Sequence, residues 1–343
     1  MIFTPPILIL AAVAFFISFG LTHRLAASYS LLDFPNERSL HSRPVPRSGG
    51  LGIVAGLSVA CAIALALTLA EQNALFLWLI GLTVFLALVS IVDDKIGLAP
   101  AIRFTAHAMA AGLLVWGAGL VIPSVPLPMF RDIPLGLLGA PLAFLCILWV
   151  TNLYNFMDGM DGFAGGMTVI GHSFLVYVGW REHHPLIAIV SLFVAASSTG
   201  FLVHNFPPAR IFLGDIGSIP LGFLTAGVLV LGVRDGLFDV WVATLIFSPF
   251  IVDATVTLLK RIARREKVWT PHRQHFYQRL VLAGWSHRRT VLVEYTLMLA
   301  AGFSALLYSK DTGALDLGIL IGWSMVYLFL TVLVGRVERR ISE

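Results

Sequence analysis

Five aspartates of this chain stand in three short polar turns between long apolar runs, and they are the first candidates for chemistry. They are Asp93, Asp94, Asp158, Asp161 and Asp215. Asp93 and Asp94 are neighbouring like charges, which resist ionising together unless a cation lies close to them. Paired carboxylates beside small residues suit Mg²⁺, which takes oxygen ligands from one or two carboxylates, from water and from phosphates. The pattern therefore indicates a divalent-cation site.

Glycines accompany two of these turns, 158–162 and 212–218. Glycine lets backbone N–H groups approach a phosphate closely, and a helix that begins beyond Gly217 and Ser218 would add the positive end of its dipole. One such turn is a weak signal, because acids at helix ends often serve only as caps. Three acidic turns with few basic neighbours in the sequence indicate a metal–phosphate site more strongly.

Basic partners for this site are predicted in the segment 272–279, which contains His272, His275 and Arg279. We interpret the segment as a clamp for a diphosphate, because guanidinium groups match the geometry of phosphate oxygens. Zinc is the alternative for the two histidines, but no cysteine and no third nearby histidine complete a ligand set. The polar first loop, 24–49, also suits an anionic ligand through Arg47, although a plain linker explains it as well.

The composition defines the environment of these residues. Of the 343 residues, 58% are hydrophobic and 12% are charged, whereas a soluble domain carries about 25% charged residues. The mean hydropathy is +0.88. These values exclude a soluble enzyme and a nucleic-acid binder, and they indicate a polytopic membrane protein. Cys61 and Cys146 lie in apolar runs, which predicts buried packing residues and no disulfide.

Eleven apolar runs approach the length of about 20 residues that a helix needs to cross a bilayer. They are 5–23, 50–70, 74–92, 101–121, 135–153, 163–180, 185–204, 217–233, 239–259, 290–308 and 316–334. We therefore predict an all-α, polytopic integral membrane protein with about eleven transmembrane helices. The spans leave no room for a soluble domain, so residues 1–343 are expected to form a single transmembrane catalytic domain. Its cytoplasmic loops would be 24–49, 93–100, 154–162, 204–216 and 260–289.

The basic residues predict the orientation of the chain. Nineteen of the 23 Lys and Arg residues fall in one set of connections and the C-terminal tail, and four fall in the other set. Because positive residues collect on the cytoplasmic side, the N-terminus is expected to be periplasmic and the C-terminus cytoplasmic. All five aspartates then lie at cytoplasmic helix ends, which avoids the cost of about 2.5–3.5 kcal/mol for an Asp at the bilayer centre.

Taken in order, these motifs resemble those of the polyprenyl-phosphate N-acetylhexosamine-1-phosphate transferases, of the glycosyltransferase 4 type. That family includes the phospho-N-acetylmuramoyl-pentapeptide transferase of peptidoglycan synthesis. The resemblance covers nearly the whole chain and rests on segments 35–39, 46–50, 93–94, 152–162, 205, 212–218 and 272–279. Segment 272–279 lacks the triple His of the peptidoglycan enzyme, and the first loop contains Arg. Both features look like the branch that initiates O-antigen-type glycans in Gram-negative bacteria.

The resemblance implies transfer of a sugar-1-phosphate from a UDP-N-acetylated sugar to polyprenyl (undecaprenyl) phosphate, with release of UMP, in the bacterial inner membrane. Mg²⁺, or alternatively Mn²⁺, would be held by Asp215 and Asp94, and Asp93, Asp94 and Asp215 would be catalytic. The substrate-binding residues it implies are Asn152, Asn155, Asp158, Asp161, Asn205, His272, His275, Arg279 and Arg47. We expect direct attack by the lipid phosphate in preference to a phospho-enzyme intermediate. Membrane lipids are expected partners, a homodimer is left open, and nucleic acid is not expected.

Two other classes of membrane protein share some of these features. A transporter for an anionic solute would also carry acids, but near the membrane midplane and between repeated units. A CDP-alcohol phosphotransferase would need an Asp-Gly-x-x-Ala-Arg run, whereas Asp161-Gly162 is followed here by Phe163-Ala164-Gly165-Gly166, with two glycines in place of Ala-Arg. Three ionisable residues, His107, Asp253 and Glu294, lie inside predicted spans. An interhelical hydrogen bond is one interpretation of them, and support of the acidic site is another for Asp253.

Overall fold

The structure, a computed structural model, describes residues 2–28, 31–35, 39–67, 74–267, 272–308 and 313–342. The first-loop motif residues 36–38 therefore lie outside the described residues. The helices are α1 (Pro5–Ala27), α2 (Gly50–Ala66), α3 (Ala74–Ile96), α4 (Pro100–Gly112), α5 (Gly139–Met157), α6 (Phe163–Arg181), α7 (Pro185–Asn205), α8 (Asp215–Arg234), α9 (Val240–Ile246), α10 (Ser248–Ala263), α11 (Phe276–Leu282), α12 (His287–Leu307) and α13 (Ala314–Ser342). A π-helical turn (Leu113–Gly117) extends α4, and a 3₁₀ turn (Gly136–Leu138) precedes α5.

Strands are short and occur as two antiparallel pairs among the described residues. β1 (Leu32–Asp33) pairs with β2 (Val45–Pro46) in the loop after α1, and β3 (Ser124–Val125) pairs with β4 (Ile133–Pro134) before α5. The predicted all-α, multi-pass architecture is confirmed. Eight of the described helices are long and apolar enough to cross a membrane, or nine if the bent pair α9–α10 is one span. The other two predicted spans correspond to the shorter α2 and to α4 with its π-helical turn, so the count of eleven stays a prediction.

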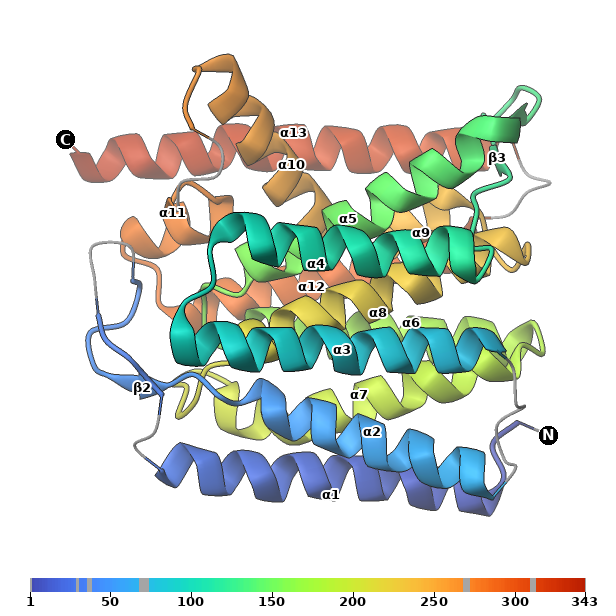
Figure 1. The fold of residues 1–343 in the computed structure, drawn as a ribbon. Coiled ribbons are helices and arrows are strands. Elements are labelled where there is room, and N and C mark those ends of the chain that lie inside the picture. The colour runs from blue at the N-terminus through green and yellow to red at the C-terminus, as the bar shows by residue number, and fades with distance from the viewer. Residues whose placement is uncertain are drawn as a thin grey trace.

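The span predicted over 239–259 is not one straight helix. It breaks between α9 and α10 with a bend of 90°. Pro249 has no backbone N–H and cannot continue the hydrogen-bond ladder of α9. The Ser248 hydroxyl instead donates to the Leu245 carbonyl at 2.8 Å. The bend turns α10 away from the axis of α9 (Figure 1).

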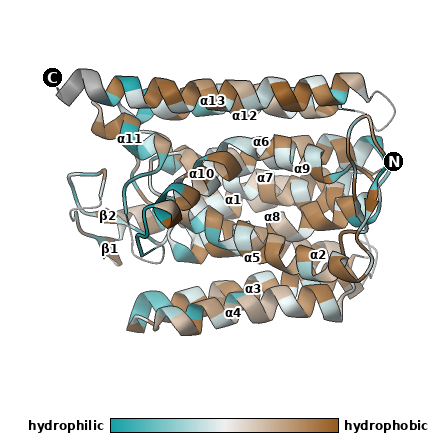
Figure 2. Cartoon of the chain, turned by 90° about the horizontal axis from the view of Figure 1, so that it is seen from above, coloured by the Kyte–Doolittle hydropathy of each residue, from teal (hydrophilic) through white to brown (hydrophobic). Residues whose placement is uncertain are grey.

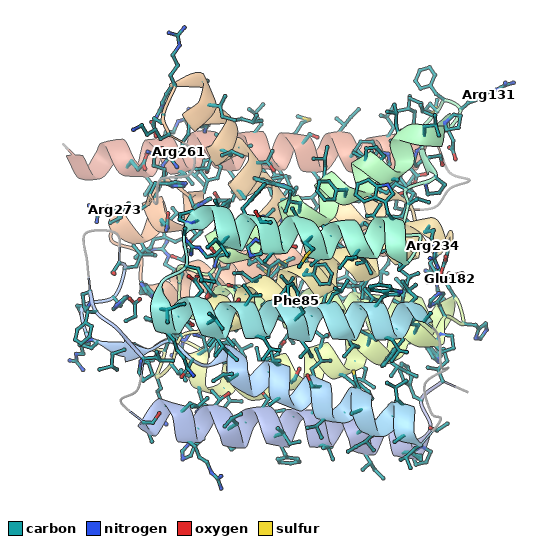
Figure 3. All side chains as sticks on the ribbon, in the orientation of Figure 1. Phe85, Arg131, Glu182, Arg234, Arg261 and Arg273 are labelled. Atoms are coloured by element: carbon teal, nitrogen blue, oxygen red, sulfur yellow. The ribbon has the colours of Figure 1, made fainter. Side chains whose placement is uncertain are left out.

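The helices run between two ends of different character. The N and C ends of the chain lie at opposite ends of the bundle (Figure 1). Hydrophobic residues line the helices, and hydrophilic residues gather toward the end that carries β1, β2 and α11 (Figure 2). Arg261 and Arg273 lie at the C-terminal end, whereas Arg131, Glu182 and Arg234 lie at the other (Figure 3). The two groups of arginines thus lie at the ends to which the basic residues of the sequence were assigned. Which end faces the cytoplasm remains a prediction.

Close contact between helix backbones builds the core around α8, whose membrane-length window is entirely buried. Lipid tails are as apolar as leucine, so small residues and tight van der Waals contact must hold membrane helices together. At the α1–α7 contact, a Cβ on Gly200 would lie 2.5 Å from the Phe15 carbonyl oxygen and 2.9 Å from the Phe19 nitrogen. A side chain at residue 200 therefore cannot fit unless a helix moves.

We expect Gly200→Ala to destabilise the protein by about 1–3 kcal/mol, because overpacking against backbone atoms forces α1 and α7 apart. Thermal unfolding of the detergent-solubilised protein measures the effect. Gly20→Ala in α1 is the matched control, since a Cβ there meets nothing within 4 Å. Equal melting temperatures for the two variants would contradict the packing argument.

Candidate functional site

A cavity of about 300 Å³ opens at the hydrophilic end of the bundle. Four of the five aspartates singled out from the sequence line it, and they come from the end of α3, the α5–α6 loop and the start of α8. The lining residues are Asp33, Ser39, Leu40, His41, Arg47, Asp94, Asn155, Asp158, Gly159, Met160, Asp161, Asn205, Phe212, Gly214, Asp215, Gln278 and His287. The fold thus brings together seven of the predicted site residues.

Asp215 begins α8 at one wall of the cavity. Gly214 precedes it with φ +70°, a conformation that favours glycine and turns the chain into the helix. The Asn155 amide donates to Asp215 Oδ1 at 2.7 Å and to the Ser218 hydroxyl at 3.1 Å. Asp215 Oδ2 lies 3.7 Å from Arg103 Nη1. The end of α5 and the start of α4 therefore hold this carboxylate in place.

Arg103 is a site residue that the motifs in the sequence did not indicate. Its Nη1 lies 3.2 Å from Asp93 Oδ2, so one guanidinium joins the last turn of α3 to the start of α8. Its position inside the predicted span 101–121 could have indicated a role, because ionisable residues within membrane spans are functional candidates. Asp93 does not line the cavity. Its Oδ1 accepts from the Leu98 N–H at 2.7 Å and closes the turn between α3 and α4.

Asp94 faces the cavity and pairs with Arg47, which directly follows β2. Arg47 Nη2 lies 3.3 Å from Asp94 Oδ1. Asp94 Oδ2 is buried and has no hydrogen-bond partner among the described residues. A buried carboxylate oxygen left without a partner costs free energy. This oxygen is therefore suited to accept a cation or a donor group from a bound molecule.

Asp158 connects the α5–α6 loop to the start of α8. Its Oδ2 accepts from the Gly214 N–H at 3.2 Å. Burial raises the pKa of Asp158 well above its usual value, and the Asp215 charge adds to this rise. The Asp158 side chain thus already contributes to holding the loop that presents Asp215.

Asp161 and Asn205 make a second connection between the same two loops. Asp161 Oδ2 accepts from the Ala209 N–H at 3.0 Å. Asn205 Oδ1 accepts from the Gly162 N–H at 2.9 Å, and its amide donates to the Ile211 carbonyl at 2.9 Å. The predicted nucleotide-binding residues therefore also define the shape of the cavity.

Besides Asp93, four predicted site residues lie outside the cavity lining. The Asn152 amide donates to the Leu148 carbonyl at 2.7 Å, and its oxygen lies 3.3 Å from His107 Nδ1, which turns it toward α4. Arg279 pairs with Glu338 of α13. The other two are His272 and His275, described next.

The histidine pair packs beside the cavity against α10. His275 Nδ1 lies 3.1 Å from Asp253 Oδ1, and the His272 and His275 rings are 4.9 Å apart. Burial is the main reason that the pKa of His272 falls to about 4, which leaves it neutral at pH 7. Asp253 also accepts from the backbone N–H groups of Phe276 and Tyr277, at 3.0 and 3.3 Å. Of this region, Gln278 and His287 line the cavity, whereas the three residues of the predicted diphosphate clamp do not. The clamp therefore stays a prediction.

The donor chemistry of the cavity fits a hard cation. Asp94 and Asp215 present carboxylate oxygens, which Mg²⁺ prefers to nitrogen or sulfur. Within the described part of the chain, no group of three or more acidic, histidine or cysteine side chains is placed to hold a metal by itself. A cation here would need water or substrate phosphates as further ligands, which is usual for Mg²⁺.

Comparisons with known proteins agree with this geometry. The sequence profile described as glycosyl transferase family 4 matches residues 75–233, which run from α3 to the last turn of α8. A probable undecaprenyl-phosphate N-acetylglucosaminyl 1-phosphate transferase of Bacillus subtilis is 32% identical over 300 residues, 87% of this chain and 82% of the relative. A decaprenyl-phosphate N-acetylglucosaminephosphotransferase of Mycobacterium leprae is 30% identical over 345 residues, 91% and 86% of the two chains.

A third relative is a phospho-N-acetylmuramoyl-pentapeptide-transferase of Clostridium beijerinckii, 31% identical over 207 residues, which cover 58% of this chain and 61% of the relative. The fold, the acid-lined cavity and these similarities together define a multi-pass membrane transferase. The chain belongs to glycosyl transferase family 4, the family of polyprenyl-phosphate sugar-1-phosphate transferases, as its motifs predicted.

We expect Asp253→Asn to loosen the segment 272–279, because an amide cannot accept from His275 and two backbone N–H groups as the carboxylate does. Losing a buried hydrogen bond to a charged group costs about 1.5–3 kcal/mol. Hydrogen exchange should therefore speed up at Phe276 and Tyr277. Unchanged protection at these amides would contradict the role of Asp253 as the N-terminal cap of α11.

Proposed function

We propose that the protein transfers a sugar-1-phosphate of the N-acetylhexosamine type from a UDP-sugar to undecaprenyl phosphate. UMP is released, and the product begins a lipid-linked glycan of the O-antigen type or a similar cell-envelope polysaccharide. The observation that carries the proposal is the convergence of Asp94, Asp158, Asp161 and Asp215 on one cavity at the hydrophilic end of an apolar bundle. A lipid phosphate and a water-soluble nucleotide sugar can meet at such a place. The relatives named for N-acetylglucosamine transfer make that sugar our first choice.

The reaction we propose is a direct displacement at phosphorus. An oxygen of the lipid phosphate forms a bond to the β-phosphorus of the UDP-sugar, and the bond from that phosphorus to the bridging oxygen breaks, so UMP leaves. A lipid phosphate is largely ionised near neutral pH, so a strong base is not required. Phosphoryl transfer depends mainly on positioning and on charge stabilisation, which the fixed carboxylates and Arg47 can supply.

Each residue has a proposed part in this reaction. Asp215 and Asp94 would hold Mg²⁺, or alternatively Mn²⁺, whose charge offsets the repulsion between the two phosphates. Asp93 would act through Arg103, which it holds beside Asp215. Asn155 and Asp158 keep Asp215 and Gly214 in position, and Arg47 is placed to contact a phosphate.

The proposed location is the bacterial inner membrane, with the cavity on the cytoplasmic face. Support comes from Arg261 and Arg273, which lie at the same end as the C-terminus, and from the paucity of basic residues assigned to the other side (Figure 3). The aspartates lie at one end of the bundle. This position argues against a transporter for an anionic solute, whose charged groups would lie near the membrane midplane.

We expect Asp215→Asn to lower the rate of metal-dependent UMP release by at least about 100-fold, because the amide removes the charge that would bind the cation. UMP release from UDP-N-acetylglucosamine and undecaprenyl phosphate, with purified protein in detergent, measures this. His183→Asn is the control, since His183 is exposed and lies in the α6–α7 connection, away from the cavity. Full activity of Asp215→Asn would refute the proposed metal ligand.

The identity of the sugar is tested by a panel of radiolabelled UDP-sugars with undecaprenyl phosphate as the acceptor. We expect label from UDP-N-acetylglucosamine to enter the lipid fraction faster than label from UDP-glucose, which lacks the N-acetyl group. Equal incorporation of both sugars would contradict the N-acetylhexosamine assignment. Absence of incorporation from every UDP-sugar would contradict the proposed reaction itself.

A further inference from the structure

His287 lines the cavity although nothing in its sequence surroundings marks it as a site residue. It is the first residue of α12, directly after Ser286, whose hydroxyl caps the helix by accepting from the Arg289 N–H at 3.2 Å. The imidazole Nδ1 lies 3.2 Å from Asp161 Oδ1, and the two side chains are only 18% and 13% exposed. α12 therefore adds a fourth wall to a cavity whose acids come from the other loops.

The contacts of Asp161 fix how the imidazole is held. Asp161 Oδ2 accepts from the Ala209 N–H, and Asp161 Oδ1 lies at ion-pair distance from His287 Nδ1. A carboxylate only accepts, so the proton between the two side chains resides on Nδ1 of the ring. Nε2 lies on the opposite edge of the ring, and among the described residues no hydrogen bond engages it. A carboxylate that orients a histidine in this way fixes both its tautomer and its direction.

We propose that His287 contacts the nucleotide-sugar donor through Nε2 and that Asp161 is the positioning residue that orients it. This inference rests on the proposed function and deepens it. It also revises the part expected for Asp161 from the sequence, which was direct contact with the nucleotide. Both Asp161 oxygens already have protein partners, whereas Nε2 of His287 is the group left to meet a ligand.

The surroundings of the pair favour the donor over the lipid acceptor. The cavity lining also includes Gly159 and Met160 of the α5–α6 loop and Asn205 at the end of α7. A nucleotide sugar offers hydroxyl, amide and phosphate groups to such a lining, whereas a polyprenyl chain needs continuous apolar surface. The charged pair Arg47–Asp94 comes from the residue after β2 and from α3. The phosphates of the donor would therefore contact other elements than the part of the donor that contacts His287.

Binding without turnover is the direct test. Calorimetry of UDP-N-acetylglucosamine with the full-length protein, in the absence of lipid acceptor, separates donor affinity from catalysis. We expect His287→Ala to weaken this binding about 10-fold, the usual effect of losing one hydrogen bond to a ligand. The KM for the UDP-sugar should rise to a similar extent, and the KM for undecaprenyl phosphate should not change.

Two conservative variants distinguish the two ring nitrogens. The amide of His287→Asn can replace the Nδ1 donor toward Asp161 but does not reach the position of Nε2, so it should bind the donor as weakly as His287→Ala. The longer amide of His287→Gln reaches that position and should recover part of the affinity. Recovery by Asn and not by Gln would overturn the assignment of Nε2 as the contact.

The positioning role of Asp161 is tested by measurements that would not change if Asp161 only stabilised the fold. Nitrogen-15 NMR of histidine-labelled protein should show His287 protonated at Nδ1, and Asp161→Asn should shift the proton toward Nε2. Asp161→Asn should also weaken donor binding much less in the His287→Ala background than in the wild-type protein, because the two residues act as a unit. Independent, additive losses would mean that Asp161 acts without His287.

The outcomes separate this inference from the proposed function. If wild-type protein neither binds nor uses any UDP-sugar, the proposed function is wrong. If wild-type protein is active but His287→Ala and His287→Gln bind the donor normally, only the role of His287 is wrong. A change confined to the KM for undecaprenyl phosphate would assign His287 to the acceptor and overturn the proposal. Thermal melting checks that each variant is folded, with His183→Asn as the histidine control.

Discussion

Mutual repulsion of carboxylates at the edge of an apolar bundle is the constraint on which the rest of this site depends. Five aspartates line one cavity, and Asp93 is buried beside it. Like charges in a medium of reduced dielectric repel strongly unless donors and cations lie close to them. The loops that carry these acids must therefore also supply their partners.

The partners differ from one acid to the next. Some acids are paired with arginines, and Asp158 is not. Arg47 and Arg103 bring full positive charge to Asp94, Asp93 and Asp215. Asp158 receives a backbone N–H, and among the described residues no ion pair offsets its burial. The side with arginines can attract a phosphate and still leave Asp94 Oδ2 without a partner. An unsatisfied oxygen beside a guanidinium is suited to a cation and a phosphate that arrive together.

The sequence predicted the acids, and Arg47 and Asn155 beside them, but not which residue pairs with which, for a physical reason. Helix ends are set by local hydropathy and by the cost of burying charge, so the turns with Asp94, Asp158 and Asp215 follow from composition and spacing. The pairing of Arg103 with Asp215, or of His287 with Asp161, depends on which helices are neighbours. Hydropathy does not specify helix neighbours, because in lipid the choice among them is made by close packing of small residues such as Gly200.

The difference between residue type, which the sequence gives, and pairing, which the fold gives, also explains the segment 272–279. His272, His275 and Arg279 have the residue types of an anion clamp, and residue type and spacing were all that the sequence offered. In the fold, Asp253 of α10 binds His275 and the backbone of α11, and Glu338 of α13 binds Arg279. Because these contacts fix α11 beside the cavity, they also fix the short connection to α12, and with it the place of His287. A loop whose basic residues are held by the protein can thus serve the site by positioning the helix that follows it.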